Sequence, residues 1–225
     1  MRINVAFTPD EQFSAPVGVV VDVLRATSTI AQALATGYRR VLCCAEIEDA
    51  RALRQEIPES LVGGERKAVQ IDGFDVGASP REFLEPRAET LILSTTNGTR
   101  AILETARRCE EVLLGSLLNL DAVARAAHGR DAVLVCAGFQ GAFAIDDAYC
   151  AGRIVHLLDG ERTDSAVAAE TLARAFPTAL DGLTARTYGP PGLEDDIAFC
   201  ARENTLDVVP RLGGMVGPAA EILLA

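Results

Sequence analysis

The residues that follow the apolar run VGVVV at positions 17–21 carry side chains that can bind a charged ligand. Asp22 comes directly after the run, and Arg25, Thr27 and Ser28 follow shortly after it. A run of this kind is typical of a strand buried on both faces, and in open α/β sheets ligands bind at the carboxyl ends of such strands. The carboxylate can hold a cation, while the guanidinium, the hydroxyls and helix-start amides can hold an anion. The alternative is that these groups only tie the turn and cap the next helix.

A second apolar run, LIL at 91–93, is also followed by a polar segment that opens a helical pattern. Hydroxyls, an amide and backbone N–H groups at a helix start can surround a phosphate or another oxyanion, and a glycine there lets the backbone approach closely. The segment lacks the lysine and the spacing of a P-loop. It is therefore a candidate substrate-binding segment, with helix capping as the alternative, and its residues are Ser94, Thr95, Thr96, Asn97, Gly98 and Arg100.

Acidic residues occur at three predicted joints between elements. Asp22 follows the first run, Glu65 and Arg66 follow a double glycine, and Asp146 and Asp147 open a later helix. Carboxylate oxygens are the ligands that Mg²⁺ prefers, so the four acids are candidate metal ligands. With only two histidines in the chain, a histidine-rich zinc site is disfavoured.

Asp22 can act in two ways, as a metal ligand or as a covalent acceptor of a phosphoryl group. The first is preferred, because Leu24 stands where a D-x-D pattern of aspartyl-phosphate hydrolases would have its second aspartate.

Composition limits the class of partner. The 225-residue chain is 49% hydrophobic, enough for a substantial core, and its formal net charge is −11. A strongly acidic protein is a poor binder of nucleic acid or anionic membranes, so a small molecule is the expected partner. The start of the chain has neither a signal-peptide pattern nor a long apolar span, which predicts a cytoplasmic protein.

Short apolar runs alternate with segments of helical period, which predicts an α/β fold with a largely parallel sheet and helices on both faces. We expect one compact domain over 1–225, with two closely packed α/β halves as the alternative organisation. Residues 63–80, rich in glycine, read as a long ordered loop, and the C-terminal third reads as helices and loops. The expected strands are 3–7, 17–21, 40–44, 90–93, 111–114 and 131–136, and the expected helices are near 28–36, 46–56, 97–107, 119–127, 147–158 and 164–175.

Five motifs in order make the chain resemble the magnesium-dependent 2-phosphosulfolactate phosphatase family over roughly residues 1–210. They are VVVDVLRATSTI, GGER, GFDVGASP, STTNGTRA and DDAYCAG. Two positions depart from the family pattern: Asp146 stands where many relatives carry Glu, and Ala78 stands in a GNSP-like position.

The resemblance implies a homodimeric α/β/α enzyme that uses Mg²⁺ to hydrolyse (R)-2-phospho-3-sulfolactate to 3-sulfolactate and phosphate, a step of coenzyme M biosynthesis. The residues agree with phosphate monoester chemistry, since Asp22, Arg25, Glu65 and Arg66 combine metal-binding carboxylates with an anion pocket. Two alternatives stay open: a phosphatase acting on another small phosphorylated hydroxy acid, and a non-catalytic anion-binding protein.

Overall fold

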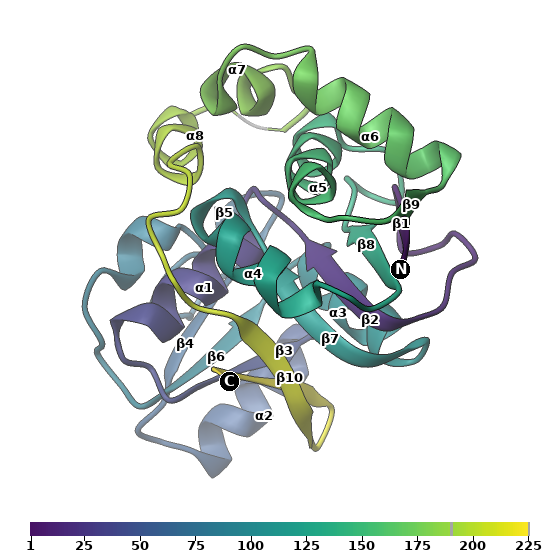
Figure 1. The fold of residues 1–225 in the computed structure, drawn as a ribbon. Coiled ribbons are helices and arrows are strands. Elements are labelled where there is room, and N and C mark those ends of the chain that lie inside the picture. Colours follow the sequence, from purple (N-terminus) through teal and green to yellow (C-terminus); the bar gives the residue numbers. More distant parts are fainter. Residues whose placement is uncertain (190, 225) are drawn as a thin grey trace.

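A single sheet of 11 strands runs through the part of the chain that the computed structural model describes, residues 1–189 and 191–224 (Figure 1). The strand order is β5–β4–β6–β3–β11–β10–β7–β2–β8–β1–β9. The strands are β1 (Arg2–Ala6), β2 (Ala15–Val21), β3 (Arg40–Cys44), β4 (Leu61–Arg66), β5 (Val69–Gln70), β6 (Thr90–Ser94), β7 (Cys109–Gly115), β8 (Ala132–Cys136), β9 (Glu161–Arg162), β10 (Pro210–Val216) and β11 (Ala219–Leu224). The helices are α1 (Ala26–Thr36), α2 (Ile47–Glu56), α3 (Gly98–Ala106), α4 (Leu120–Ala127), α5 (Ile145–Leu157), α6 (Asp164–Arg174), α7 (Ala179–Thr184) and α8 (Glu194–Cys200), with short 3-10 helices η1 (Pro80–Phe83) and η2 (Leu117–Asn119).

The predicted α/β class is confirmed, and each predicted strand and helix is present within about two residues. The sheet is mostly parallel but mixed. Gly37 ends α1 in the left-handed conformation (φ 117°), as its place after the helical pattern predicts. None of the described helices is long and apolar enough to cross a membrane.

Helices cover both faces of the sheet, as β2 shows most directly. Val17, Val19 and Val21 pack in a core with α4, α5 and α6, whereas Val20 packs in a second core with α1 and α3. Successive strand residues point to opposite faces, so a strand buried on both sides needs apolar residues at consecutive positions. This requirement accounts for the unbroken run that ends at Asp22.

Two expectations were wrong. Residues 63–80 are not one loop, because Gly63 and Gly64 continue β4 beside β6. A Cβ at Gly64 would lie 2.4 Å from the Ser94 carbonyl oxygen, so the close packing of β4 on β6 requires glycine here. Glycine carries no side chain, and the sequence therefore lacks the apolar pattern that would predict a strand. In the C-terminal third, α7 and α8 are helical, but residues 210–224 form the β10–β11 hairpin, which inserts between β3 and β7. Part of the predicted loop there, residue 190, lies outside the described residues.

The hairpin reverses the direction of half the sheet. Three antiparallel steps separate β7 from β3, so β3, β4 and β6 run opposite to β7, β2, β8 and β1. The end of β6 nevertheless meets the end of β2, because Gly98, the first residue of α3, packs on Asp22 and Ala26. A Cβ at Gly98 would lie 2.4 Å from the Ala26 Cβ and 2.6 Å from Asp22 Oδ2. This contact brings the first and second polar segments together.

Candidate active site

A cavity of about 320 Å³ lies where the segments after β2, β4 and β6 meet. Six predicted site residues line it: Asp22, Arg25, Glu65, Thr95, Thr96 and Asn97. The remaining lining residues are Leu24, Ala26, Lys67, Ala68, Ala78, Phe139, Gln140, Arg186, Tyr188, Gly189 and Leu193. The cavity therefore combines the predicted polar segments with the loop that precedes α8.

Asp22 is a buried acid that faces this cavity. Its Oδ1 accepts a hydrogen bond from the Ala26 N–H at 3.1 Å, and within the described residues no hydrogen bond reaches Oδ2. Burial raises the pKa of Asp22 from its ordinary value of 3.8 to about 7; the Ala26 N–H opposes this shift, and repulsion from Glu65 and Asp146 adds to it. Arg25 and the Ala26 N–H therefore compensate the negative charge of this carboxylate only in part.

Asp146 and Asp147 are buried at the start of α5, outside the lining of the cavity. Asp147 accepts hydrogen bonds from the N–H groups of Val23 at 2.9 Å and Gly138 at 3.0 Å, so it ties the end of β2 to the loop after β8. Asp146 accepts hydrogen bonds from the Asp147 N–H at 3.1 Å and from the Tyr188 hydroxyl. Burial raises the pKa of both acids. The contacts give Asp147 a positioning role and connect Asp146 to the cavity through Tyr188, which lines it.

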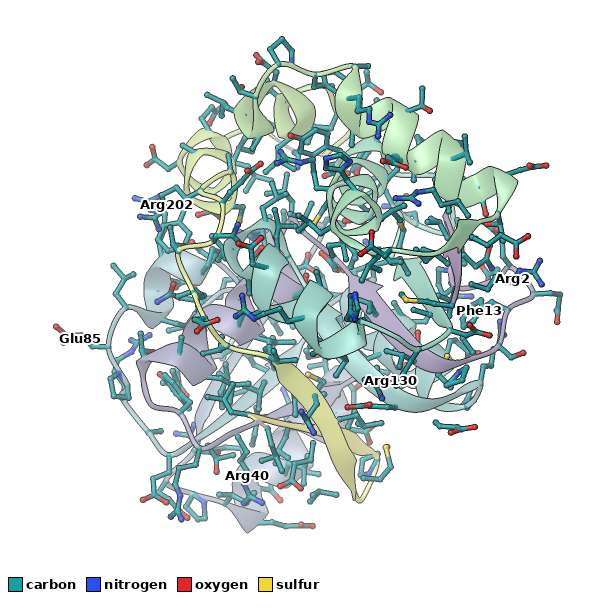
Figure 2. The ribbon with its side chains drawn as sticks, in the orientation of Figure 1. Arg2, Phe13, Arg40, Glu85, Arg130 and Arg202 are labelled. Carbon is teal, nitrogen blue, oxygen red and sulfur yellow. The ribbon has the colours of Figure 1, made fainter. Side chains whose placement is uncertain are left out.

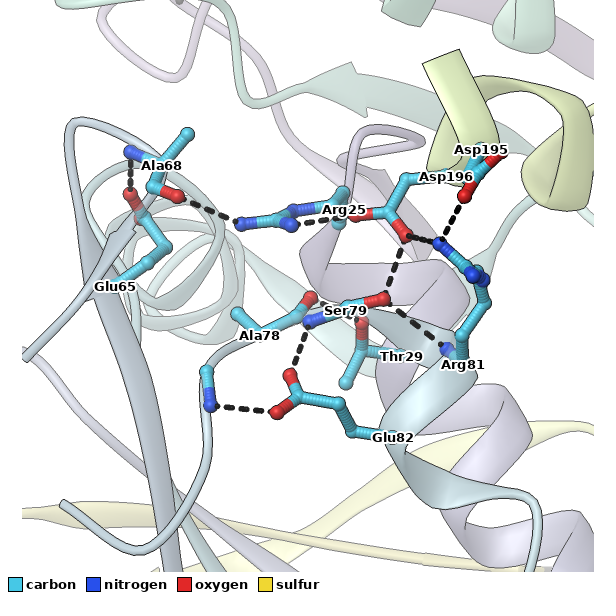
Figure 3. Close-up of polar contacts among 11 residues, drawn as sticks. Arg25, Thr29, Glu65, Ala68, Ala78, Ser79, Arg81, Glu82, Asp195 and Asp196 are labelled. Atoms are coloured by element: carbon cyan, nitrogen blue, oxygen red, sulfur yellow. Dashed lines mark hydrogen bonds and ion pairs between the residues drawn. The ribbon is translucent and has the colours of Figure 1, made fainter. Parts of the chain in front are cut away.

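Arg25, just before α1, is held by a buried ion pair. It donates to Asp196 Oδ2, on α8, at 2.5 Å and to the Ala68 carbonyl at 3.4 Å. Asp196 also accepts a hydrogen bond from the Ser79 hydroxyl at 2.6 Å, and Ser79 caps η1 as its position in the sequence predicts. Figure 3 shows this chain of contacts, with Arg81 on its outer side. Arg25 therefore enters the cavity in a fixed orientation.

Glu65, near the end of β4, joins two walls of the cavity. Its Oε1 accepts a hydrogen bond from the Thr96 N–H at 2.8 Å, and its Oε2 accepts one from the Ala68 N–H at 2.6 Å. Lys67 and Ala68 form the turn between β4 and β5 with positive φ angles of 55° and 62°, a conformation that costs free energy in residues other than glycine. The hydrogen bond to Ala68 helps to hold this turn at the cavity.

The start of α3 differs from the prediction. The expected side-chain cap from Thr96 or Asn97 is not formed; instead, Thr95 Oγ1 accepts a hydrogen bond from the Thr99 N–H at 3.2 Å. Asn97 Oδ1 accepts a hydrogen bond from the Gln140 N–H at 3.2 Å and so links α3 to the loop after β8. Thr96 Oγ1 is buried without a hydrogen-bond partner among the described residues. A ligand in the cavity is one group that this hydroxyl can bind.

Three predicted hydroxyls stay in the local fold rather than in the cavity. Thr27 Oγ1 donates to the Asp22 carbonyl at 2.8 Å, and Ser28 Oγ donates to the Val23 carbonyl at 2.8 Å. Ser94, which is fully buried, accepts a hydrogen bond from Arg66 at 3.0 Å. These geometries match the alternative in which the hydroxyls tie the turns.

Two predicted arginines also lie outside the cavity lining. Arg66 donates to the carbonyls of Glu65 and Ala45, at 2.8 and 2.9 Å, and so ties the ends of β3, β4 and β6 together. Arg100 is half exposed and pairs with Asp10. Among the predicted arginines, only Arg25 reaches the cavity.

One wall of the cavity, formed by Arg186, Tyr188 and Phe139, was not predicted from the sequence. Tyr188 stacks on Phe139 with ring centroids 4.3 Å apart. Arg186 lies over the Tyr188 ring, with its guanidinium carbon 5.6 Å from the ring centroid. The glycines and prolines of TARTYGPPG predict a loop, but no local signal shows that it returns to the end of β2.

The residues present fit a bound Mg²⁺ ion. No group of three or more histidine, cysteine or acidic side chains among the described residues forms a ready-made metal site. Mg²⁺ is commonly held by one or two carboxylates, with waters and substrate phosphate completing the shell. Asp22 meets this requirement, because it faces the cavity and its charge is disfavoured by burial and by the nearby acids. A divalent cation would compensate that charge.

An α/β sheet with a cavity that presents carboxylates, an arginine and helix-start groups has the features of an enzyme acting on a small anionic substrate. A sequence profile described as 2-phosphosulpholactate phosphatase matches residues 4–214. The chain belongs to the 2-phosphosulfolactate phosphatase family, as its motifs indicated, and this makes it an enzyme of the phosphoric monoester hydrolase class.

Curated relatives share this similarity over nearly their full length. A protein of Caldanaerobacter subterraneus subsp. tengcongensis is 39% identical over 209 residues, 86% of each chain. One of Gloeobacter violaceus is 39% identical, over 94% of this chain and 95% of its own, and one of Thermus thermophilus is 36% identical, over 97% and 98%. Each is named probable 2-phosphosulfolactate phosphatase.

Proposed function

We propose that the protein hydrolyses (R)-2-phospho-3-sulfolactate to 3-sulfolactate and phosphate and that it requires Mg²⁺. Family membership supports the reaction, and the buried Asp22 carboxylate together with the Arg25 guanidinium in one cavity is the observation that carries the proposal. Family resemblance alone supports a homodimer and a place in coenzyme M biosynthesis, and a cytoplasmic location stays a prediction from the sequence.

Hydrolysis of a phosphate monoester breaks the bond between phosphorus and the ester oxygen and forms a new bond from a water oxygen to phosphorus. The equatorial phosphoryl oxygens gain stabilisation from positioned donors. Arg25 supplies a guanidinium that Asp196 already orients, and the Thr96 hydroxyl supplies a buried donor. The leaving oxygen must also receive a proton.

Bound Mg²⁺ would neutralise phosphoryl charge and lower the pKa of a coordinated water. Asp22 is the principal residue that would hold it. Glu65 also lines the cavity, but both of its oxygens already accept backbone hydrogen bonds, so it would reach the ion only through their remaining lone pairs. Asp146 lies outside the cavity lining and would contribute through its hydrogen bond with Tyr188. The hydrogen bonds of Asp147 favour a positioning role over direct coordination.

Phosphate release from a panel of phosphorylated hydroxy acids tests the substrate. We expect the highest kcat/KM with 2-phosphosulfolactate, and loss of activity when EDTA removes the metal. A higher kcat/KM with another phosphorylated hydroxy acid would replace the substrate and keep the reaction. No release from any panel member with Mg²⁺ present would contradict the proposal.

A further inference from the structure

Three cationic side chains line the cavity, and they differ in how their charge is balanced. Arg25 is paired with the buried carboxylate of Asp196 at 2.5 Å. Within the described residues, neither Lys67 nor Arg186 takes part in an ion pair or donates a side-chain hydrogen bond. A substrate with two acidic groups would supply an anion for an arginine of this kind.

Arg186 is nevertheless held in place. Its guanidinium lies over the ring of Tyr188, which stacks on Phe139. Gly189 follows with φ +92°, and a Cβ at this position would come within 2.5 Å of Arg186 Nη2. A cation–π contact of this kind favours one position of the guanidinium and leaves its N–H groups available to an anion. The loop therefore presents a positioned anion-binding group, for which glycine at 189 leaves room.

The charges give the cavity two different regions. Asp22 and Glu65 form the acidic region, where a metal-bound phosphoryl group fits. Arg186 lies close enough to Asp146 for their charges to interact, but the direct hydrogen bond to that carboxylate comes from the Tyr188 hydroxyl. An acidic group of the substrate that faced Asp22 and Glu65 would be repelled, whereas one that faced Arg186 would be attracted.

We infer that Arg186 is a specificity-determining residue that binds an acidic group of the substrate other than its phosphate, the sulfonate or the carboxylate. This inference rests on the proposed phosphatase function. Arg186 would make the protein selective for phosphorylated acids over phosphate monoesters that carry no further charge. When such a monoester binds, Arg186 gains no anionic partner in the cavity. The planar fork of arginine fits both kinds of acid.

The test compares substrates with and without that acid in Arg186→Gln and Arg186→Lys. The substrates are 2-phosphosulfolactate, 2-phospholactate and p-nitrophenyl phosphate. We expect Arg186→Gln to lower the ratio of kcat/KM for 2-phosphosulfolactate to that for p-nitrophenyl phosphate by at least tenfold, and Arg186→Lys to lower it less. Arg202→Gln is the matched control: it removes the same charge from the exposed segment after α8 (Figure 2), at a residue outside the cavity lining, and should leave the ratio unchanged.

A ratio that stays within twofold of wild type in Arg186→Gln would overturn the inference, whatever happens to the absolute rates. If wild-type protein hydrolyses none of these esters, the phosphatase proposal fails, and calorimetric binding of 3-sulfolactate then decides the role of Arg186. Binding at least tenfold weaker in Arg186→Gln would support it. Equal binding by both proteins, or none by wild type, would overturn it.

Discussion

The guanidinium of Arg25 donates to the carboxylate of Asp196 at 2.5 Å, although the two residues are 171 positions apart in the chain. Both side chains are almost completely buried, at 9% and 7% exposed. Asp196 also accepts a hydrogen bond from the Ser79 hydroxyl, so the position of its carboxylate is fixed independently of Arg25. Through this pair, helix α8 fixes the orientation of the arginine that reaches the cavity.

Asp196→Asn should therefore lower kcat/KM by about tenfold or more per folded molecule, since Arg25 loses a charged partner and part of its alignment. Breaking a buried pair should also cost about 3–5 kcal/mol of unfolding free energy. Asp195→Asn is the control, because this neighbouring acid is 77% exposed and pairs with Arg81 at the surface. Steady-state kinetics and thermal melts on both variants check this. Equal kcat/KM in the two variants would mean that Asp196 does not position Arg25 for catalysis.

Asp22 predicts a pH dependence of stability in the metal-free protein. Its pKa is about 7 in the folded protein and 3.8 ordinarily, so the folded state holds the proton more tightly. Protonated Asp22 therefore stabilises the folded state fully below pH 3.8, and this stabilisation is lost as pH rises toward 7. At about 1.36 kcal/mol per pKa unit, the free energy of unfolding falls by on the order of 4 kcal/mol over this range.

Urea unfolding in EDTA from pH 4 to pH 7.5 checks this for wild type and Asp22→Asn. The variant lacks this titration, so its unfolding free energy minus that of wild type should grow as pH rises. A difference that stays constant over this range would show that the pKa of Asp22 is not raised.

Asn97 makes no cap hydrogen bond, so Asn97→Ala should change stability by less than the roughly 1 kcal/mol that loss of a cap costs. It should instead release the Gln140 segment, which lines the cavity, and lower kcat/KM several-fold. Thr95→Ala, which removes the observed contact to the Thr99 N–H, should cost about 1 kcal/mol. Melts and kinetics on the same samples decide: a clear loss of stability in Asn97→Ala with unchanged kcat/KM per folded molecule would reverse the assignment.

Gly98→Ala tests the contact that joins the two polar segments. The new Cβ would lie 2.6 Å from Asp22 Oδ2 and 2.4 Å from the Ala26 Cβ, so α3 must shift away from the end of β2. Gly217→Ala on the β10–β11 turn is the control: its φ of +57° makes alanine cost stability, but the new Cβ would meet no other group. We expect a fall of at least tenfold in kcat/KM for Gly98→Ala only. Wild-type kinetics in this variant would show that the packing does not position Asp22.

Local patterns predicted the strands and helices because they are buried on defined faces, and β2 is the clearest case. They also identified Asp22, Glu65 and Thr96 as candidates, since each follows or ends a strand, but β4 and β6 run opposite to β2 and the packing of Gly98 is what brings these residues into one cavity. The hairpin at 210–224 was missed, because Gly213 and Gly214 interrupt its pattern at a register shift. Arg186 and Asp196 were missed for another reason: their roles depend on how a distant loop and helix return to the cavity.

The metal dependence of Asp22→Asn tests whether the Asp22 carboxylate holds the Mg²⁺ that the proposed reaction requires. Phosphate release from 2-phosphosulfolactate is measured as Mg²⁺ is titrated into EDTA-treated protein, wild type and variant. Asparagine preserves the size of the side chain but removes the charge that holds the cation. The account predicts no activity without metal, saturable recovery in wild type, and a loss of at least a hundredfold in the variant across the titration. Full wild-type activity in EDTA, or the same Mg²⁺ dependence and rate in Asp22→Asn, would contradict it.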